Sequence, residues 1–195
     1  MSGAPTRRLF FALWPDAEQR AALLHATARI VRHCGGRPVP ETNLHLTLAF
    51  LGSVPESRLQ ELSAIGRQAA AAWPADAALL SVSLAALEHW AKAQVLAVLA
   101  RKDEPNGTPA PGLADLARIL TTETAAAGFS PDLKPFRAHV TVARKVARAP
   151  RAIGMREVLW SFDAFALVES RTLAEGPVYS VVESYLLDDA QRVRT

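Results

Sequence analysis

"NLHLTLAF", residues 43–50, is an apolar run that carries a histidine and a threonine two positions apart, and "RAHVTVAR", residues 137–144, repeats that arrangement. Successive side chains of a β-strand point to opposite faces, so residues two apart share a face. Each run predicts a strand with one polar pair on a solvated face and apolar residues turned to a core. The polar pairs are His45 with Thr47 and His139 with Thr141. The expected core residues are Leu44, Leu46, Leu48, Ala138, Val140 and Val142.

The sequence around these runs alternates between strand-like and helix-like segments. Further strands are predicted at residues 8–14, 79–88, 94–101, 161–170 and 178–187. Apolar residues recur at helical spacing in residues 15–36, 53–73 and 113–128. We expect Gly52 to end the first motif strand, with Ser53 and Glu56 forming a capping box at the next helix. This order of segments indicates two similar α+β halves.

The segments between these elements are short. Residues 103–112, which are rich in proline and glycine, predict a loop, and residues 172–177 predict a hairpin turn between the last two strands. We therefore expect residues 1–195 to form a single bilobal domain without a linker, with short flexible ends at about residues 1–6 and 190–195.

The composition is that of a soluble globular protein, because 50% of the 195 residues are hydrophobic and 21% are charged. The only cysteine, Cys34, excludes an internal disulfide framework and suits a reducing compartment. Pro15 and Asp16 end the N-terminal apolar run after six residues, too few for a signal peptide or a membrane span. We expect a cytoplasmic protein with no membrane partner and no obligate protein partner.

The charge is unevenly placed. The segment from Lys134 to Arg156 contains seven basic residues and no acidic one, and since the whole chain carries +3, the remainder carries −4. This basic segment surrounds the second His and Thr pair, which favours a polyanionic partner such as nucleic acid over a merely solvated loop. Two of its arginines, Arg148 and Arg151, are candidates for contact with RNA.

Either histidine alone would be read as a structural residue, but the recurrence indicates a site. If the two strands occupy equivalent places in two lobes, both pairs face one cleft. One histidine can then take a proton while the other gives one, and the threonine hydroxyls can donate hydrogen bonds to a phosphate. The pattern therefore predicts acid-base chemistry on a phosphate ester without a metal or another cofactor.

Other kinds of site are poorly supported. The remaining histidines and Cys34 have no metal-ligand spacing, and a zinc site built on His45 and His139 lacks a third ligand. Glycine patterns of phosphate loops and dinucleotide sites are absent, and no serine stands in a nucleophile-elbow context.

The sequence resembles a known family. "NLHLTLAFLG" and "PFRAHVTVAR" are similar to the paired motifs of the 2H phosphoesterase superfamily, and their flanks resemble its bacterial and archaeal RNA 2′,3′-cyclic phosphodiesterases, also called 2′-5′ RNA ligases. The opening "RLFFALWP" and the closing "FALVESRTLAEGPVYSVVESYLL" carry the same likeness, which spans nearly the whole chain. It implies an α+β fold of two pseudo-symmetric lobes, with antiparallel sheets facing a central groove and helices outside.

The resemblance also implies a reaction and roles. Water opens a 2′,3′-cyclic phosphate at an RNA end to leave a 2′-phosphate, and the reverse reaction with a 5′-hydroxyl makes a 2′-5′ linkage. His45 would be the proton donor to the departing 3′ oxygen, and His139 would be the base. The two motifs are alike, so the residues themselves leave these two roles open.

The resemblance associates an aromatic residue and an arginine, each five positions after its histidine, with binding of the terminal base. Here these residues are Phe50 and Arg144. An odd spacing would turn both to the core face of an unbroken strand, and an unpaired arginine is too costly there. We therefore expect the second strand to end or bulge by about Ala143, while Phe50 can also be a core residue.

Two other functions remain open at this stage. The same site could act on small cyclic phosphates, or the chain could be a non-catalytic RNA-binding module that uses its basic segment. The presence of all four residues of the two polar pairs favours an enzyme, because binding alone does not require a paired acid and base.

Overall fold

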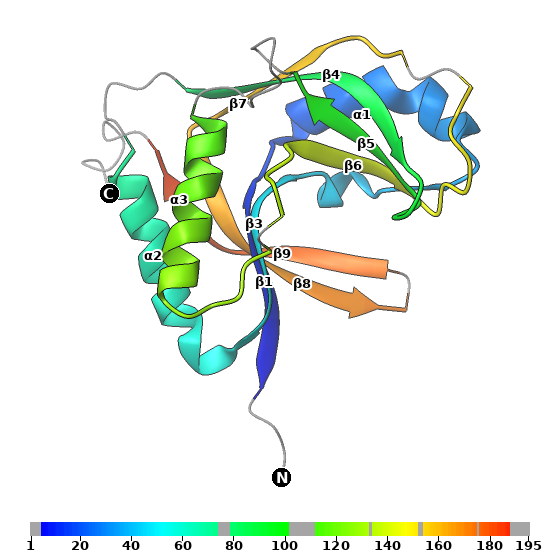
Figure 1. The fold of residues 1–195 in the computed structure, drawn as a ribbon. Helices are drawn as coiled ribbons and strands as arrows, with labels where there is room; N and C mark the ends of the chain where they lie inside the picture. The colour runs from blue at the N-terminus through cyan, green and yellow to red at the C-terminus, as the bar shows by residue number, and fades with distance from the viewer. Residues whose placement is uncertain are drawn as a thin grey trace.

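The computed structural model describes residues 5–73, 79–101, 112–132, 134–151, 154–174 and 176–187. In this part of the chain, two antiparallel β-sheets face each other and three α-helices cover them (Figure 1). The expected loop at residues 103–112 lies outside the described residues except for Gly112. Thr6, expected within a flexible end, already belongs to a strand, whereas residues 190–195 lie outside the described part.

The first sheet has four strands in the order β3-β1-β8-β9, and all neighbours are antiparallel. The helices α2 and α3 lie side by side and pack against this sheet (Figure 1). The elements of this lobe are β1 (Thr6–Leu13), β3 (Leu46–Pro55), β8 (Ala164–Leu173), β9 (Gly176–Leu186), α2 (Leu59–Ala71) and α3 (Leu113–Ala126).

The second sheet has five strands in the order β2-β6-β5-β4-β7, again all antiparallel. The helix α1 packs against this sheet through β6 and β7. The elements of this lobe are β2 (Arg37–Pro38), β4 (Leu80–Trp90), β5 (Val95–Ala100), β6 (His139–Arg144), β7 (Val158–Phe162) and α1 (Ala17–His33). Short 3-10 turns cover Glu41–Asn43 and Glu56–Arg58.

The two lobes are not the two halves of the sequence. The helix α1 follows a strand of the first sheet but covers the second sheet, and α3 follows a strand of the second sheet but packs on the first. A capping box fixes the start of α1, since the Asp16 carboxylate accepts from the Gln19 backbone N–H at 2.8 Å. The predicted similarity of two α+β halves therefore holds for the lobes in space, but the chain crosses between them repeatedly.

A β-bulge in β6 follows the threonine of the second motif. Two successive residues of β5 oppose Thr141 and Ala143, so Val142 is an extra residue in its strand. An extra residue resets the alternation of faces. Arg144 consequently leaves the core face, and the expected bulge near Ala143 is confirmed.

The strand β3 has a bulge at the equivalent place. Two successive residues of β1 oppose Thr47 and Ala49, so Leu48 is the extra residue. Phe50 then pairs with Phe10 on the face that is turned away from the main core. Both motifs therefore consist of a His and Thr pair, a bulge, and a residue that the bulge returns to the face of the pair.

Three local predictions are wrong. The first motif strand does not end at Gly52, because Gly52 adopts a φ of +69° at a second irregularity and the strand continues to Pro55. Ser53 is consequently paired with β1 and forms no capping box, and α2 begins only at Leu59. The segment 161–170 is also not one strand, because the chain leaves the second sheet at Phe162 and enters the first at Ala164.

One continuous cluster of buried apolar residues lies between the sheets and their helices and contains all six residues that the motifs assign to the core. A smaller cluster lies on the opposite face of the first sheet. It consists of Phe10, Ala12, Ala166 and Val168, with Trp14, Phe50 and Tyr179 packed against it. The face that carries the first polar pair is therefore largely aromatic, and since His45 and Thr47 are half-buried on it, the expectation of a solvated face holds there only in part.

Candidate active site

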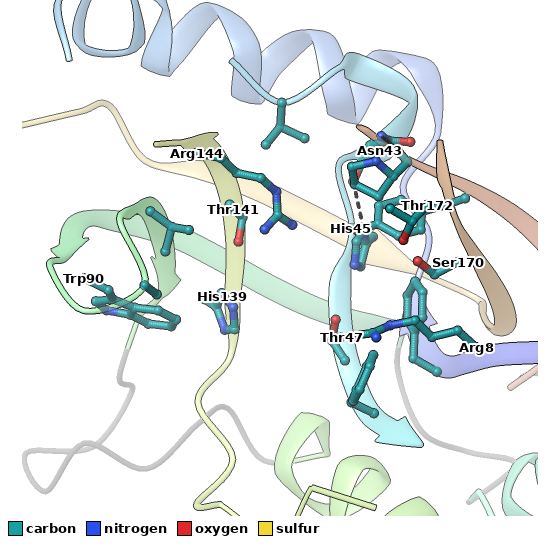
Figure 2. Close-up of a pocket in the computed structure, with 17 residues that line it drawn as sticks. Arg8, Asn43, His45, Thr47, Trp90, His139, Thr141, Arg144, Ser170 and Thr172 are labelled. Atoms are coloured by element: carbon teal, nitrogen blue, oxygen red, sulfur yellow. Dashed lines mark hydrogen bonds between the residues drawn. The ribbon is translucent and has the colours of Figure 1, made fainter. Parts of the chain in front are cut away.

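The two His and Thr pairs line one cavity between the sheets, with a volume of about 520 Å³. Figure 2 shows His45, which directly precedes β3, and Thr47 of β3 pointing into the same space as the second pair, which lies on β6. The two strands run in opposite directions in this view. As a result, His45 lies across from Thr141, and His139 lies across from Thr47. The structure thus brings together the four residues that the sequence singles out.

Both imidazole rings are held in the same way. His45 Nδ1 lies 2.7 Å from the carbonyl oxygen of Asn43, and His139 Nδ1 lies 2.7 Å from the carbonyl oxygen of Arg137. A carbonyl only accepts, so each neutral ring donates its Nδ1–H and keeps a lone pair on Nε2. Each histidine therefore has a fixed tautomer, with Nε2 available to accept or, once protonated, to donate a proton.

Aromatic rings surround His45. Its ring centroid lies 4.9 Å from those of Phe10 and Tyr179, and Trp14 stacks on it at 5.6 Å with an interplanar angle of 18°. Burial lowers the pKa of His45 to about 4, and the positive charges of Arg144 and His139 act in the same direction. The hydrogen bond to the Asn43 carbonyl opposes this shift without overcoming it.

His139 has fewer aromatic neighbours. The ring of Trp90 lies 4.5 Å from its own, and the guanidinium of Arg137 lies over Trp90 at 5.1 Å. Burial again lowers the pKa of His139, and Arg137 and Arg144 lower it further. Both histidines are therefore neutral near pH 7 in the free protein, as proton acceptance requires.

The cavity also contains Phe50 and Arg144, the two residues that the resemblance associates with base binding. Phe50 packs against Phe10 at 6.4 Å between ring centroids, so it belongs partly to the small aromatic cluster. Arg144 reaches toward Thr141 and His45 in Figure 2. Within the described residues, Arg144 has no acidic partner, and an unpaired guanidinium in a cleft favours an anionic ligand.

Sequence reasoning missed several other residues of this cavity. Arg8 lies over the Phe50 ring at 4.8 Å and reaches toward Thr47 (Figure 2). Asn43 donates from Nδ2 to the Pro177 carbonyl at 2.7 Å, which connects the first motif to β9. The remaining lining residues that were missed include Trp90, Ser170, Thr172 and Tyr179. Arg8, Ser170, Thr172 and Tyr179 reach the site through the pairing of β1, β8 and β9 with one another and with β3, whereas Trp90 comes from the end of β4 in the second sheet, so no local pattern marks them.

Arg148 and Arg151 are exposed and belong to the segment between β6 and β7. Neither lines the cavity. Their assignment to RNA contact therefore stays a prediction about a strand that extends beyond the cavity.

No three His, Cys, Asp or Glu side chains among the described residues are grouped so that they could hold a metal ion. Within the same residues, no helix is long and apolar enough to cross a membrane.

The sequence has curated relatives of similar length. The RNA 2′,3′-cyclic phosphodiesterase of Thermus thermophilus is 36% identical over 183 residues, which cover 92% of this chain and 90% of that protein. The protein of the same name from Escherichia coli is 33% identical over 146 residues, with 73% and 74% covered. A model of the family described as LigT like Phosphoesterase matches residues 13–85.

Solved structures share the fold. Escherichia coli LigT complexed with 3′-AMP has a TM-score of 0.74 and 26% identity, with 94% of this chain and 99% of that chain covered. The Thermus thermophilus protein TT0787 has a TM-score of 0.76 and 32% identity, with 93% and 99% covered. These structural matches agree with the two facing antiparallel sheets of this structure. The chain belongs to the LigT-like phosphoesterase family.

Proposed function

We propose that this protein hydrolyses 2′,3′-cyclic phosphates at RNA 3′ ends to 2′-phosphates, with His45 and His139 as the acid and the base. The names of the curated relatives support the substrate. The observation that carries the mechanism is the matched pair of Nδ1 to carbonyl contacts, because they leave both Nε2 atoms for the same cavity. Hydrolysis of this ester needs one proton removed from water and one delivered to the leaving oxygen.

In this scheme His139 accepts a proton from water as the water oxygen bonds to phosphorus. The phosphorus to O3′ bond breaks, and His45 gives its Nε2 proton to O3′. Thr47 and Thr141 donate hydrogen bonds to the non-bridging oxygens, whose charge grows in the transition state. Arg144 balances this charge.

The low pKa of His45 has to rise before His45 can serve as the acid. A bound cyclic phosphate brings a negative charge between the two histidines, and an opposite charge nearby favours the protonated imidazole. Substrate binding therefore favours protonation of His45, which is the proton donor in the next step. His139 faces the same phosphate. Its Nε2 accepts a hydrogen bond from the attacking water and so remains the proton acceptor.

The same groups support ligation. If a 5′-hydroxyl of a second RNA replaces water, His139 accepts its proton and the product is a 2′-5′ phosphodiester with a free 3′-hydroxyl. No other reactant is required, because the cyclic ester itself carries the leaving group. The balance between hydrolysis and ligation then depends on which nucleophile occupies the site.

The test is incubation with an oligoribonucleotide that ends in a 2′,3′-cyclic phosphate, in the presence of EDTA, followed by identification of the product. We expect a 2′-phosphate, and we expect His45→Gln and His139→Gln to reduce turnover by roughly 10²- to 10⁴-fold. His25→Gln is the matched control, because His25 is exposed on α1. A 3′-phosphate product, or normal turnover by either folded variant of the pair, would contradict the mechanism.

A second candidate keeps the site and changes the substrate to a small cyclic phosphate. The cavity of about 520 Å³ favours it, because pockets of roughly 300–1,000 Å³ hold single small ligands. Comparison of kcat/KM for 2′,3′-cyclic AMP and for the oligonucleotide separates the two, since an RNA enzyme prefers the longer substrate. Tight RNA binding without turnover of either substrate would instead support a binding module.

A further inference from the structure

A second cavity of about 490 Å³ adjoins the first on one side of the motif pairs. The two cavities share four lining residues, which are Thr47, Phe50, Trp90 and His139. The outer wall of the second cavity comes from α3 and from the segment that joins α3 to β6. Its residues there are Thr121, Asp132, Lys134, Pro135, Phe136 and Arg137.

The second cavity opens on one histidine only. His139 lines it and His45 does not, whereas both line the first cavity. Figure 2 agrees with this, since His139 and Thr47 lie at one end of the motif pairs and His45 and Thr141 at the other. The second cavity therefore opens beside the proposed base, His139, and not beside the proposed acid, His45.

Phosphoryl transfer places the attacking and leaving oxygens roughly in line, on opposite sides of phosphorus. If His45 protonates the leaving oxygen, the ribose that carries this oxygen lies on the His45 side, in the first cavity. The nucleophile then approaches from the His139 side, where the second cavity opens. Water needs no cavity of this size, but a nucleotide that presents a hydroxyl does.

We propose that the second cavity binds the nucleotide of an incoming RNA that presents its 5′-hydroxyl to His139. This inference rests on the function proposed above and adds to it a place for the second strand. The 5′ oxygen bonds to phosphorus, its proton passes to His139, the bond from phosphorus to O3′ breaks, and His45 protonates O3′. The product is a 2′-5′ linkage, so atoms and charges balance without another reactant.

The wall of the second cavity has the chemistry that single-stranded RNA requires. Lys134 and Arg137 supply cationic groups beside the carboxylate of Asp132, and Phe136 and Trp90 bring aromatic surfaces on which bases can stack. Arg137 is held in place by an ion pair with Glu88 and by its position over Trp90. The Lys134 side chain is 84% exposed and pairs with the Asp132 carboxylate at 3.0 Å, so its ammonium stands at the solvent edge, where the next phosphate would pass.

This wall is also attached to the first motif. The backbone N–H of Asp132 donates to the carbonyl of Phe50 at 3.0 Å. The segment before β6 is therefore fixed to β3 close to Thr47, and the cavity has a defined shape next to the phosphate site. A site that is shaped for a nucleotide favours the hydroxyl of that nucleotide over bulk water as the attacking group.

The experiment measures ligation and hydrolysis in one reaction. A donor oligonucleotide with a 2′,3′-cyclic phosphate is mixed with an excess of a 5′-hydroxyl trinucleotide, and the 2′-5′ joined product and the 2′-phosphate product are quantified together. We expect Lys134→Glu to lower the ratio of ligation to hydrolysis by about tenfold or more, because it reverses the charge beside the acceptor path. Arg32→Glu, the same reversal on the exposed face of α1, should leave the ratio unchanged.

A second variant tests the cavity by volume instead of charge. Thr121→Trp fills the α3 wall with an indole and should also lower the ratio, whereas Thr121→Ser should not. Circular dichroism and the melting temperature check that both variants fold. Because each measure is a ratio within one reaction, a partly unfolded sample changes both products together and leaves the ratio intact.

The outcomes distinguish this inference from the proposed function. Hydrolysis without any ligation by the wild type, or an unchanged ratio in both Lys134→Glu and Thr121→Trp, would overturn the acceptor site and leave the hydrolase intact. No hydrolysis and no ligation by the wild type would overturn the function itself. A ratio that falls in both variants and holds in both controls supports the site.

Discussion

The ring centroids of Phe10 and His45 lie 4.9 Å apart, on the face of the first sheet that is turned away from the main core. This contact makes a proposed catalytic group part of an aromatic cluster with Trp14 and Tyr179. The cluster both orients the imidazole and withholds water from it. Truncation of His45 to alanine would therefore remove packing as well as chemistry, and glutamine is the better probe.

The first prediction concerns stability and pH. The pKa of His45 is about 4 in the folded protein, against 6.5 for an unperturbed histidine, so the unfolded chain takes up a proton first as the pH falls. Stability is therefore complete above pH 6.5 and decreases toward pH 4, by at most about 3 kcal/mol from this group. Urea unfolding at pH 7.5 and pH 5 should show this loss in the wild type and a smaller one in His45→Gln.

The control for this prediction is His25→Gln, which alters an exposed histidine of α1 and should follow the wild type at both pH values. His139 contributes in the same direction, since burial lowers its pKa as well. If His45→Gln and the wild type lost equal stability between the two pH values, the aromatic surroundings would not be excluding water from His45.

The second prediction concerns the pH dependence of turnover. With one histidine protonated and the other neutral, kcat/KM should follow a bell-shaped curve whose two apparent pKa values belong to the pair. Both pKa values are lowered in the free protein, so the maximum of kcat/KM should lie on the acid side of pH 6.5. The maximum of kcat should lie at a higher pH than that of kcat/KM, because the bound phosphate raises both pKa values. A rate that climbs steadily into alkaline pH would indicate a different base.

The third prediction concerns Arg8. Its guanidinium lies over Phe50 and reaches toward Thr47, and within the described residues it has no acidic partner. We expect Arg8→Gln to lower kcat/KM by about 10- to 100-fold, as the loss of a donor that stabilises developing charge does. Arg7→Gln is the control, because Arg7 pairs with Glu169 and does not line the cavity. A larger loss in Arg7→Gln than in Arg8→Gln would contradict a phosphate role for Arg8.

The fourth prediction concerns Arg148 and Arg151, which are exposed beyond the cavity. If a long RNA follows the basic segment, reversing both to glutamate should raise KM for an oligonucleotide and leave cleavage of 2′,3′-cyclic AMP almost unchanged. The effect should fade at high salt, since each neutralised phosphate contributes about 0.7 to the salt slope for single strands. Equal changes for both substrates would instead indicate a structural role.

The sequence was sufficient for the residues whose pattern is local. The two His and Thr pairs were found because they repeat, and the bulge at Val142 was anticipated because Arg144 cannot remain in a core. The equivalent bulge at Leu48 gave no such signal, since Phe50 is tolerated on either face. A charged residue such as Arg144 thus indicates a change of face in the strand, whereas an apolar residue such as Phe50 gives no such indication.

Most of the strand β7 was missed for a related reason, since only its end lies within the predicted segment 161–170. Its side chains alternate, with Trp160 fully buried and Leu159 63% exposed. An exposed leucine hides the alternation from sequence reasoning, because an apolar residue on the solvent face reads as part of a core. Arg8 and Tyr179 were missed because they reach the site only through pairing between strands far apart in the sequence.

The crossing of the chain between the lobes has a consequence for protein synthesis. The carbonyl of Pro177 that holds Asn43, and the ring of Tyr179 against His45, belong to β9, the last strand of the fold. Residues near position 45 leave the ribosome long before these partners exist, and contacts so distant in sequence form late. A nascent chain therefore carries both motifs without an assembled site, and RNA nearby meets a working catalyst only after the final strand has docked.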